Sequence, residues 1–170
     1  MPSYQKGITM NIRVANVEDA ERINMLNRQI GSSPSLCRTK ETLANAIASE
    51  NQLILVAEVC GLVSGYIVIQ LLSVLHDDKP TGRISALVVD ETFREMTIGT
   101  QLLDSAAQFF KNKGCNRMEM CSPVCQEDHD GFHLLVGYKI TPKRYLKLIA
   151  SQQMLAEQSN KVCRPAHGWS

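Results

Sequence analysis

An apolar strand that leads into a short polar turn and then an amphipathic helix is the feature that most limits what this chain can fold into. The strand is expected over residues 83 to 89, and apolar residues recur at helical spacing from Ile98 to Phe110. The turn between them carries Arg94, and Gly99 opens the helix. The first N–H groups of a helix lack partners within it and carry partial positive charge, so this pattern predicts an anion site, most naturally for a phosphate.

The glycine spacing in this turn excludes two common nucleotide-binding loops. A Walker loop needs Gly-x-x-x-x-Gly-Lys-Ser/Thr, and a dinucleotide fingerprint needs three spaced glycines. Residues 94 to 99 read Arg-Glu-Met-Thr-Ile-Gly and resemble the Arg/Gln-x-x-Gly-x-Gly/Ala pyrophosphate loop of the GNAT superfamily, the CoA-dependent N-acyltransferases. Thr97 stands where that family usually has its first glycine, and a side chain there could crowd the pyrophosphate. The alternative is an ordinary helix start whose arginine is solvated.

Length and composition suit one globular domain. The chain has 170 residues, of which 44% are hydrophobic and 21% charged. A net charge of +1 without an aromatic-interleaved basic cluster argues against a nucleic-acid partner. The N-terminus lacks an apolar leader, and the apolar stretch from Val63 to Leu75 is too short to span a bilayer, so we expect a cytoplasmic protein without a membrane partner. The six cysteines are then reduced thiols.

The rest of the chain alternates strand and helix patterns without a linker or a repeat. Strands are expected over residues 11 to 15, 53 to 59, 63 to 75, 83 to 89, 116 to 122, 138 to 140 and 144 to 149. Helices are expected over residues 18 to 30, 39 to 50, 98 to 113 and 128 to 136. The segment from Gly31 to Arg38, which contains two serines before Pro34 and one after it, is expected to be a loop.

A second match to the same family lies near the C-terminus. The run Phe132-His133-Leu-Leu-Val-Gly137-Tyr138 is similar to the family's Phe-Tyr-x-x-x-Gly-Phe/Tyr segment, and a basic strand follows it. The resemblance then covers residues 11 to 149, with residues 1 to 10 as an extension. It implies an α/β (α+β) fold in which helices flank a central mixed, largely antiparallel sheet. Residues 150 to 170 are expected to be a short helical extension followed by a tail. Residues 150 to 159 are expected to dock as a helix on the same or a partner subunit, and docking on a partner would imply a homodimer.

The resemblance implies an N-acetyltransferase that moves the acetyl group of acetyl-CoA to a primary amine of a small molecule or peptide by direct attack. The pantetheine arm would insert between the strands at 83 to 89 and 116 to 122, where a backbone N–H meets the thioester carbonyl. The cofactor-binding residues implied are Leu87, Val88, Val89, Arg94, Glu95, Met96, Thr97, Ile98, Gly99 and Thr100. No carboxylate pair or aromatic cage specifies the acceptor.

Two positions depart from the family's usual catalytic residues. Ser85 stands where many members have a glutamate base, so deprotonation would fall to water or another group. His133 stands where many members have a tyrosine acid, and an imidazole with a pKa near ~6.5 could protonate the leaving CoA thiolate. Two alternatives stay open: His133 only packs within a helix, or the chain is a catalytically degenerate, CoA-binding regulatory module.

A metal site is the remaining hypothesis. Cys121, Cys125, His129 and His133 fall at intervals of four, and structural zinc favours four nitrogen and sulfur ligands. Pro123 interrupts the run, and Cys121 is expected on a strand, so the four side chains cannot share one helical face. We therefore expect no metal.

Overall fold

The structure of the protein, a computed structural model, describes residues 9–73, 75, 77–94, 97–120, 135, 137 and 138. The chain divides into two units, Met1–His129 and Asp130–Ser170. In the first unit the elements follow the order β1 (Met10–Val14), the 3-10 helix η1 (Val17–Asp19), α1 (Ala20–Gln29), α2 (Leu36–Ile47), β2 (Gln52–Val59), β3 (Leu62–Leu72), β4 (Thr81–Val89), the 3-10 helix η2 (Glu91–Phe93), α3 (Ile98–Asn112) and β5 (Met118–Met120).

The described strands form one mixed sheet in the order β1-β2-β3-β4-β5. The first four pair antiparallel with their chain neighbours, and β4 pairs parallel with β5. The hairpin between β2 and β3 turns at Cys60 and Gly61, whose φ angles are 51° and 81°. Two successive residues in the left-handed region match the twist of antiparallel strands. The predicted α/β fold with a mixed, largely antiparallel sheet is confirmed.

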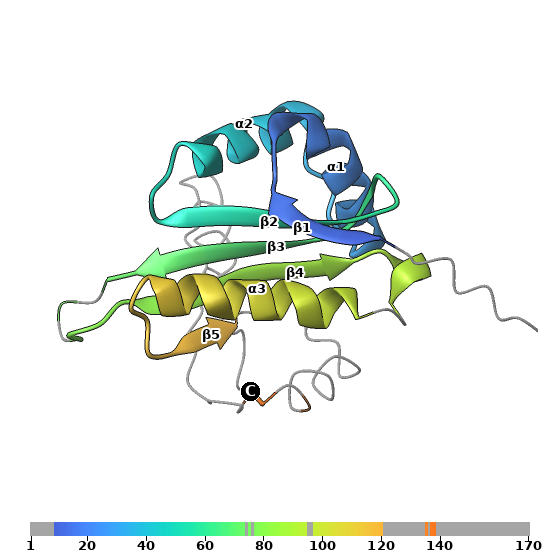
Figure 1. The fold of residues 1–170 in the computed structure, drawn as a ribbon. Coiled ribbons are helices and arrows are strands. Elements are labelled where there is room, and N and C mark those ends of the chain that lie inside the picture. Colours follow the sequence, from blue (N-terminus) through green and yellow to red (C-terminus); the bar gives the residue numbers. More distant parts are fainter. Residues whose placement is uncertain are drawn as a thin grey trace, which may run out of the picture. The chain divides into compact units, whose positions relative to one another are not determined.

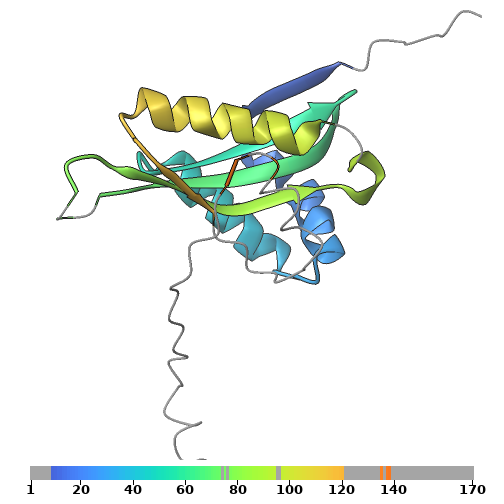
Figure 2. The same ribbon diagram turned by 90° about the horizontal axis from the view of Figure 1, so that it is seen from below.

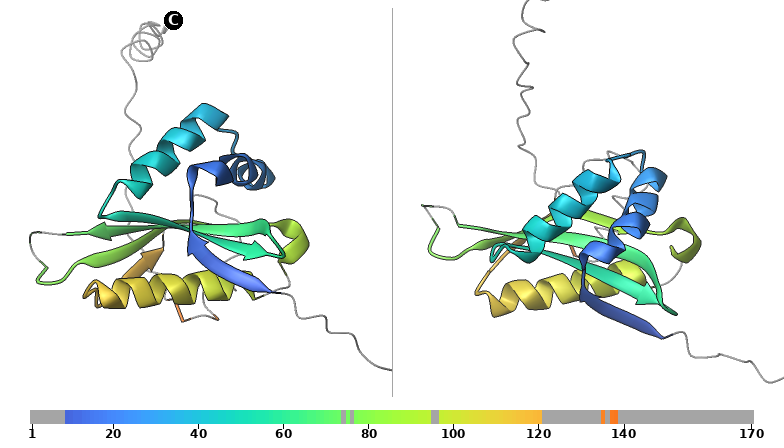
Figure 3. Two further views of the ribbon diagram at one scale, coloured as in Figure 1. Left: turned by 45° about the horizontal axis from the view of Figure 1, so that its top comes forward. Right: turned by 90° about the horizontal axis from the view of Figure 1, so that it is seen from above.

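Helices cover both faces of this sheet. In Figure 1 and in the left view of Figure 3, α1 and α2 lie on one face and α3 lies on the other. On the first face, Leu26 of α1 and Leu43 of α2 join a buried cluster with Ile54, Val56 and Tyr66 of the sheet. Because both faces are covered, β2 and β3 are apolar almost continuously and do not alternate strictly.

On the opposite face, α3 packs closely because two glycines leave room for it (Figure 2). A Cβ atom at Gly82 would lie 2.5 Å from Cγ of Phe110, near the end of the helix. A Cβ atom at Gly65 would lie 3.0 Å from the carbonyl oxygen of Val88 and 3.1 Å from Cγ2 of Ile98, in the first turn. Both ends of α3 are therefore fixed against the sheet.

The start of α2 differs from the sequence prediction. The segment 31–38 was expected to be a loop, with the helix opening at Thr39, but α2 begins at Leu36. Ser35 is the N-cap, and its Oγ accepts a hydrogen bond of 3.2 Å from the N–H of Arg38. Thr39 therefore lies inside the helix, where its hydroxyl donates to the side-chain oxygen of Asn24 on α1.

The other elements expected in the first unit are present within a few residues of their predicted bounds. The strand predicted at 116 to 122 is confirmed at Met118–Met120. Of the segments predicted after residue 120, the structure describes only Leu135, Gly137 and Tyr138, so the helix at 128 to 136 and the last two strands lie outside the described residues. None of the helices within the described ranges is both apolar enough and long enough to cross a bilayer.

Candidate functional site

The second half of β4 has a partner strand on one side only. β5 pairs with β4 from Gly82 to Ile84, whereas β4 continues to Val89. Among the residues that the structure describes, the stretch from Ser85 to Val89 pairs with β3 alone. Within the described part of the chain no strand lies along its other edge, and N–H and C=O groups of such an edge can pair with an extended ligand.

A β-bulge marks the point where this stretch begins. The register between β3 and β4 passes from Ile69 opposite Ile84 to Val68 opposite Ala86, so Ser85 has no opposite residue. The Ser85 hydroxyl is half-buried and donates to the carbonyl oxygen of Val68 at 3.4 Å. Bulges occur next to active sites because they redirect side chains. Here the bulged side chain is a hydrogen-bond donor to the main chain and supplies no basic group.

At the start of α3, the residue in the N-cap position does not cap the helix with its side chain. Thr97 occupies the N-cap position, but its side chain makes no capping hydrogen bond. Its Oγ1 instead accepts from Nε2 of Gln101 at 3.2 Å. The first turn carries no acidic side chain. Ile98, Gly99 and Thr100 form the first turn of this helix, and the first N–H groups of a helix, with their partial positive charge, can bind an anion.

Arg94 lies in the same turn and is exposed. Its Nη2 is 3.5 Å from Oε1 of Glu91, with both side chains about half accessible to solvent. An exposed pair of this kind is worth little, about 0 to 1 kcal/mol, so Arg94 can turn toward a more highly charged anion at small cost. Glu95 and Met96, which belong to the predicted loop, lie outside the described residues.

The sequence-predicted residues that the structure describes thus lie at the end of β4, in the turn after it and at the start of α3. Leu87, Val88 and Val89 end β4, and Val88 is buried against the α1 and α2 face. The predicted proton donor His133 lies outside the described residues, as do all four members of the hypothetical zinc cluster. Among the described residues, no group of three or more histidine, cysteine or carboxylate side chains could hold a metal ion.

Sequence reasoning missed Asp90, the first residue after β4, which is only 4% exposed. Its Oδ1 accepts from the N–H and the hydroxyl of Thr92 at 2.9 and 2.8 Å, and its Oδ2 accepts from the Arg22 guanidinium. Burial alone would raise the pKa of Asp90, but these bonds outweigh it and hold the pKa below its ordinary value. The pattern Asp-x-Thr after a strand is a local signal that could have predicted the turn. The bond to Arg22 has no such signal, because this arginine is 68 residues away in the chain.

Comparisons with known proteins agree with this geometry. Residues 21–138 match the model of the Acetyltransferase (GNAT) family. No curated protein matches the sequence. An aminoglycoside N-acetyltransferase solved with CoA is similar in structure, with a TM-score of 0.75 and 18% identity over 86% of this chain and 99% of that one.

Two further solved structures share the fold. A transcriptional regulator from Bacillus halodurans C-125 has a TM-score of 0.73 and 17% identity, over 83% of this chain and 100% of that one. A glucosamine-6-phosphate N-acetyltransferase from Arabidopsis thaliana has a TM-score of 0.71 and 17% identity, over 84% of this chain and 99% of that one. At such identities the likeness is one of fold.

Proposed function

Because the chain belongs to the GNAT acetyltransferase family, we propose that it transfers the acetyl group of acetyl-CoA to a primary amine of a small molecule or a peptide. One observation carries the proposal. The stretch of β4 from Ser85 to Val89, paired on one side among the described residues, leads through a short turn into the uncapped N-terminus of α3. An extended amide arm and a pyrophosphate, joined in one molecule, match these two neighbouring features.

In this proposal the pantetheine arm lies along the second half of β4, and its amides pair with the main chain of Leu87 to Val89. The pyrophosphate lies over the first turn of α3, where the N–H groups of Gly99 and Thr100 donate to its oxygens. Arg94 leaves Glu91 and adds a full positive charge. Glu95, Met96, Thr97 and Ile98 complete the loop around the phosphates.

The chemistry follows from the thioester. The neutral acceptor nitrogen attacks the carbonyl carbon, the C–N bond forms, and negative charge on the oxygen is stabilised by a main-chain N–H of β4. The C–S bond then breaks, the nitrogen loses a proton to water, and the CoA thiolate takes a proton from His133. Ser85 does not act as the base, which is supported by its hydroxyl donating to Val68.

A catalytically degenerate CoA-binding module with a regulatory role is the second candidate. Two observations favour it. Thr97 occupies the place of the first glycine in the pyrophosphate loop, and the residue at the usual position of the base is Ser85, whose neutral hydroxyl is too weak a base to take a proton from the acceptor amine. The cytoplasmic location and a reaction without metal stay predictions in both cases.

Ligand binding and turnover distinguish the two candidates. Acetyl-CoA should raise the melting temperature once its concentration exceeds the dissociation constant, because it binds only the folded chain. A screen of amines and peptide N-termini should then release CoA thiol in proportion to product. Binding without transfer to any acceptor would support the regulatory module. No thermal shift at roughly millimolar CoA, with the protein folded, would contradict both.

A further inference from the structure

We propose that Arg22 and Asp90 are positioning residues, which hold the turn between β4 and α3 in the conformation that binds a pyrophosphate and so make α1 part of the cofactor site. This inference rests on the proposed function, since it names what shapes the CoA site. Neither residue belongs to the motif that indicated the site. Both were found only because the structure brings them together.

Asp90 has a partner for every polar atom it carries. Its N–H donates to the carbonyl oxygen of Ser64 at 2.8 Å, and its own carbonyl accepts from the N–H of Phe93 at 2.9 Å. Its two carboxylate oxygens accept from Thr92 and from Arg22. The chain therefore leaves β4 in one fixed direction.

Arg22 joins three elements at this point. From α1 its Nη2 reaches Asp90, while its Nε donates to the carbonyl oxygen of Val63 on β3 at 2.7 Å. The side chain is only 19% exposed. Gln29, seven residues later and so on the same face of α1, accepts from the N–H of Glu91 at 3.1 Å. Two side chains of α1 thus hold two consecutive residues of the turn.

Three consecutive residues of β3 receive both ends of the turn. Val63 binds Arg22, Ser64 binds the N–H of Asp90, and Gly65 makes room for Ile98 in the first turn of α3. Because the beginning and the end of the turn both contact this short segment of β3, these contacts together set where the N-terminus of α3 lies relative to β4, and loss of the contacts at the beginning leaves the turn held at one end only. The separation between the arm site and the phosphate site depends on that geometry.

Charge gives the arginine a second role. Asp90 is a buried carboxylate at the start of a turn that should bind a doubly negative pyrophosphate. Without Arg22 its charge would be uncompensated at this depth and would oppose the anion. An arginine at this place both fixes the turn and neutralises the carboxylate. A glutamine could make some of the hydrogen bonds but would not neutralise the charge.

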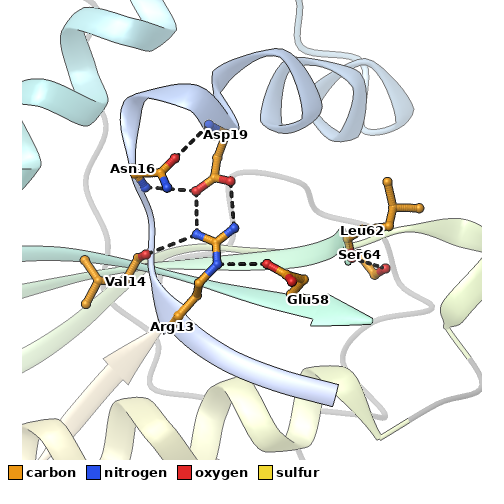
Figure 4. A network of polar contacts seen from close by, with 7 residues as sticks. All are labelled: Arg13, Val14, Asn16, Asp19, Glu58, Leu62 and Ser64. Carbon is orange, nitrogen blue, oxygen red and sulfur yellow. Dashed lines mark hydrogen bonds and ion pairs between the residues drawn. The ribbon is translucent and has the colours of Figure 1, made fainter. Parts of the chain in front are cut away.

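The molecule contains a matched control in the pair Arg13 and Asp19. Nη1 and Nη2 of Arg13 donate to both carboxylate oxygens of Asp19 at 2.8 and 2.9 Å, and its Nε donates to Glu58 at 2.9 Å (Figure 4). Asp19 is buried to a similar degree as Asp90. This pair joins β1, β2 and the start of α1, and none of its hydrogen bonds among the described residues reaches the turn after β4. Its loss should therefore cost stability alone.

The test compares Arg22→Gln and Arg13→Gln in the full chain, each measured against CoA and against pantetheine, which lacks the pyrophosphate. The dissociation constant for pantetheine divided by that for CoA reports how much the phosphate-bearing half of CoA contributes to binding. We expect Arg22→Gln to weaken CoA binding about 10-fold and pantetheine binding less than 2-fold, on the scale of a charge-assisted hydrogen bond. Arg13→Gln should lower the melting temperature and leave the ratio unchanged.

Three outcomes would overturn the inference. Equal losses of affinity for CoA and for pantetheine in Arg22→Gln would indicate general destabilisation. A selective loss of CoA affinity in Arg13→Gln as well would show that the effect is not particular to Arg22. Arg22→Lys keeps the charge and should bind CoA more tightly than Arg22→Gln. Equal CoA affinities of these two variants would contradict the role of the charge. If Arg22→Gln does not fold, Arg22→Lys and Asp90→Asn provide the same ratio. Failure of the parent protein to bind CoA would overturn the proposed function first, and is seen before any variant is made.

Discussion

The two halves of β4 differ in how they are held. The first half, from Thr81 to Ile84, pairs with β3 and β5 and lies beneath Phe110. The second half, from Ser85 to Val89, pairs among the described residues with β3 alone and begins at a bulge. One strand thus anchors the fold at one end and offers main-chain groups at the other. Substitutions in or against the first half should act on stability, and those around the second half on ligand binding and turnover.

The largest effect should come from His133, the proposed proton donor. His133→Ala should lower turnover by roughly 10²- to 10⁴-fold and leave CoA affinity near the parent value, because a proton donor acts on the leaving thiolate. Ser85→Ala is the matched control and should change turnover little, since its hydroxyl bonds to Val68. Steady-state kinetics with a working acceptor measure both. Full turnover in His133→Ala would end the assignment.

Adding a methyl group to the first half of β4, by Gly82→Ala, should produce the next largest effect. The Cβ of Gly82→Ala would lie 2.5 Å from Cγ of Phe110, so helix and strand must separate. We expect a loss of about 2 to 3 kcal/mol in the free energy of unfolding, typical of overpacking, with CoA affinity unchanged below the transition. Denaturant unfolding measures this loss. Adding Phe110→Leu should recover part of it, and strictly additive losses would contradict the steric account.

A substitution at the phosphate end of the second half should weaken CoA binding with a smaller effect on stability. Gly99→Val should weaken CoA by about 10-fold, or ~1.4 kcal/mol, because a side chain there opposes close approach of the phosphates. Glu95→Ala should weaken it less, since the expected contact is through the backbone. Titration calorimetry compares the two variants. An equal effect of both would contradict a main-chain phosphate site.

Acid should have the mildest effect and should act at Asp19 and Asp90, the two buried carboxylates that are paired with arginines. Burial alone would raise the pKa of Asp19, but the bonds from Arg13 and from the N–H of Asn16 outweigh it, so its pKa is lowered, like that of Asp90. A lowered folded-state pKa contributes stability above the unfolded pKa of roughly 3.9, which is lost as the pH falls through the folded value. Unfolding free energy should therefore fall below about pH 4, and less steeply in Asp19→Asn and Asp90→Asn.

Sequence patterns predicted most of the described fold because most of its signals are local. Gly61 in a hairpin turn and the apolar spacing from Ile98 to Phe110 need no knowledge of the tertiary structure. The predicted start of α2 was wrong because serine and threonine both favour the N-cap position, and the sequence offers Ser35 as well as Thr39. The structure uses Ser35, and the hydroxyl of Thr39 instead bonds to Asn24 on another helix.

The candidate site divides in the same way. Its strand-turn-helix could be predicted because Arg94 and Gly99 lie close together in the chain. The bulge at Ser85 was not predicted, since one extra residue in a strand leaves the apolar pattern unchanged. The bond from Arg22 to Asp90 spans 68 residues, and a single sequence contains no signal that pairs an arginine with one distant aspartate over another.

The position at which β5 pairs with β4 also bears on how long an acyl-CoA donor can be. The stretch from Ser85 to Val89, at ~3.3 Å per residue, is about 17 Å long. For a thioester whose arm lies along this edge, the phosphates at one end fix where the carbonyl arrives at the other. A transferred group much longer than acetyl would extend past Ser85 into the region where Ile84 already pairs with Met120. If the proposed function holds, the pairing described between β4 and β5 would thereby limit the size of the acyl group that the site accepts.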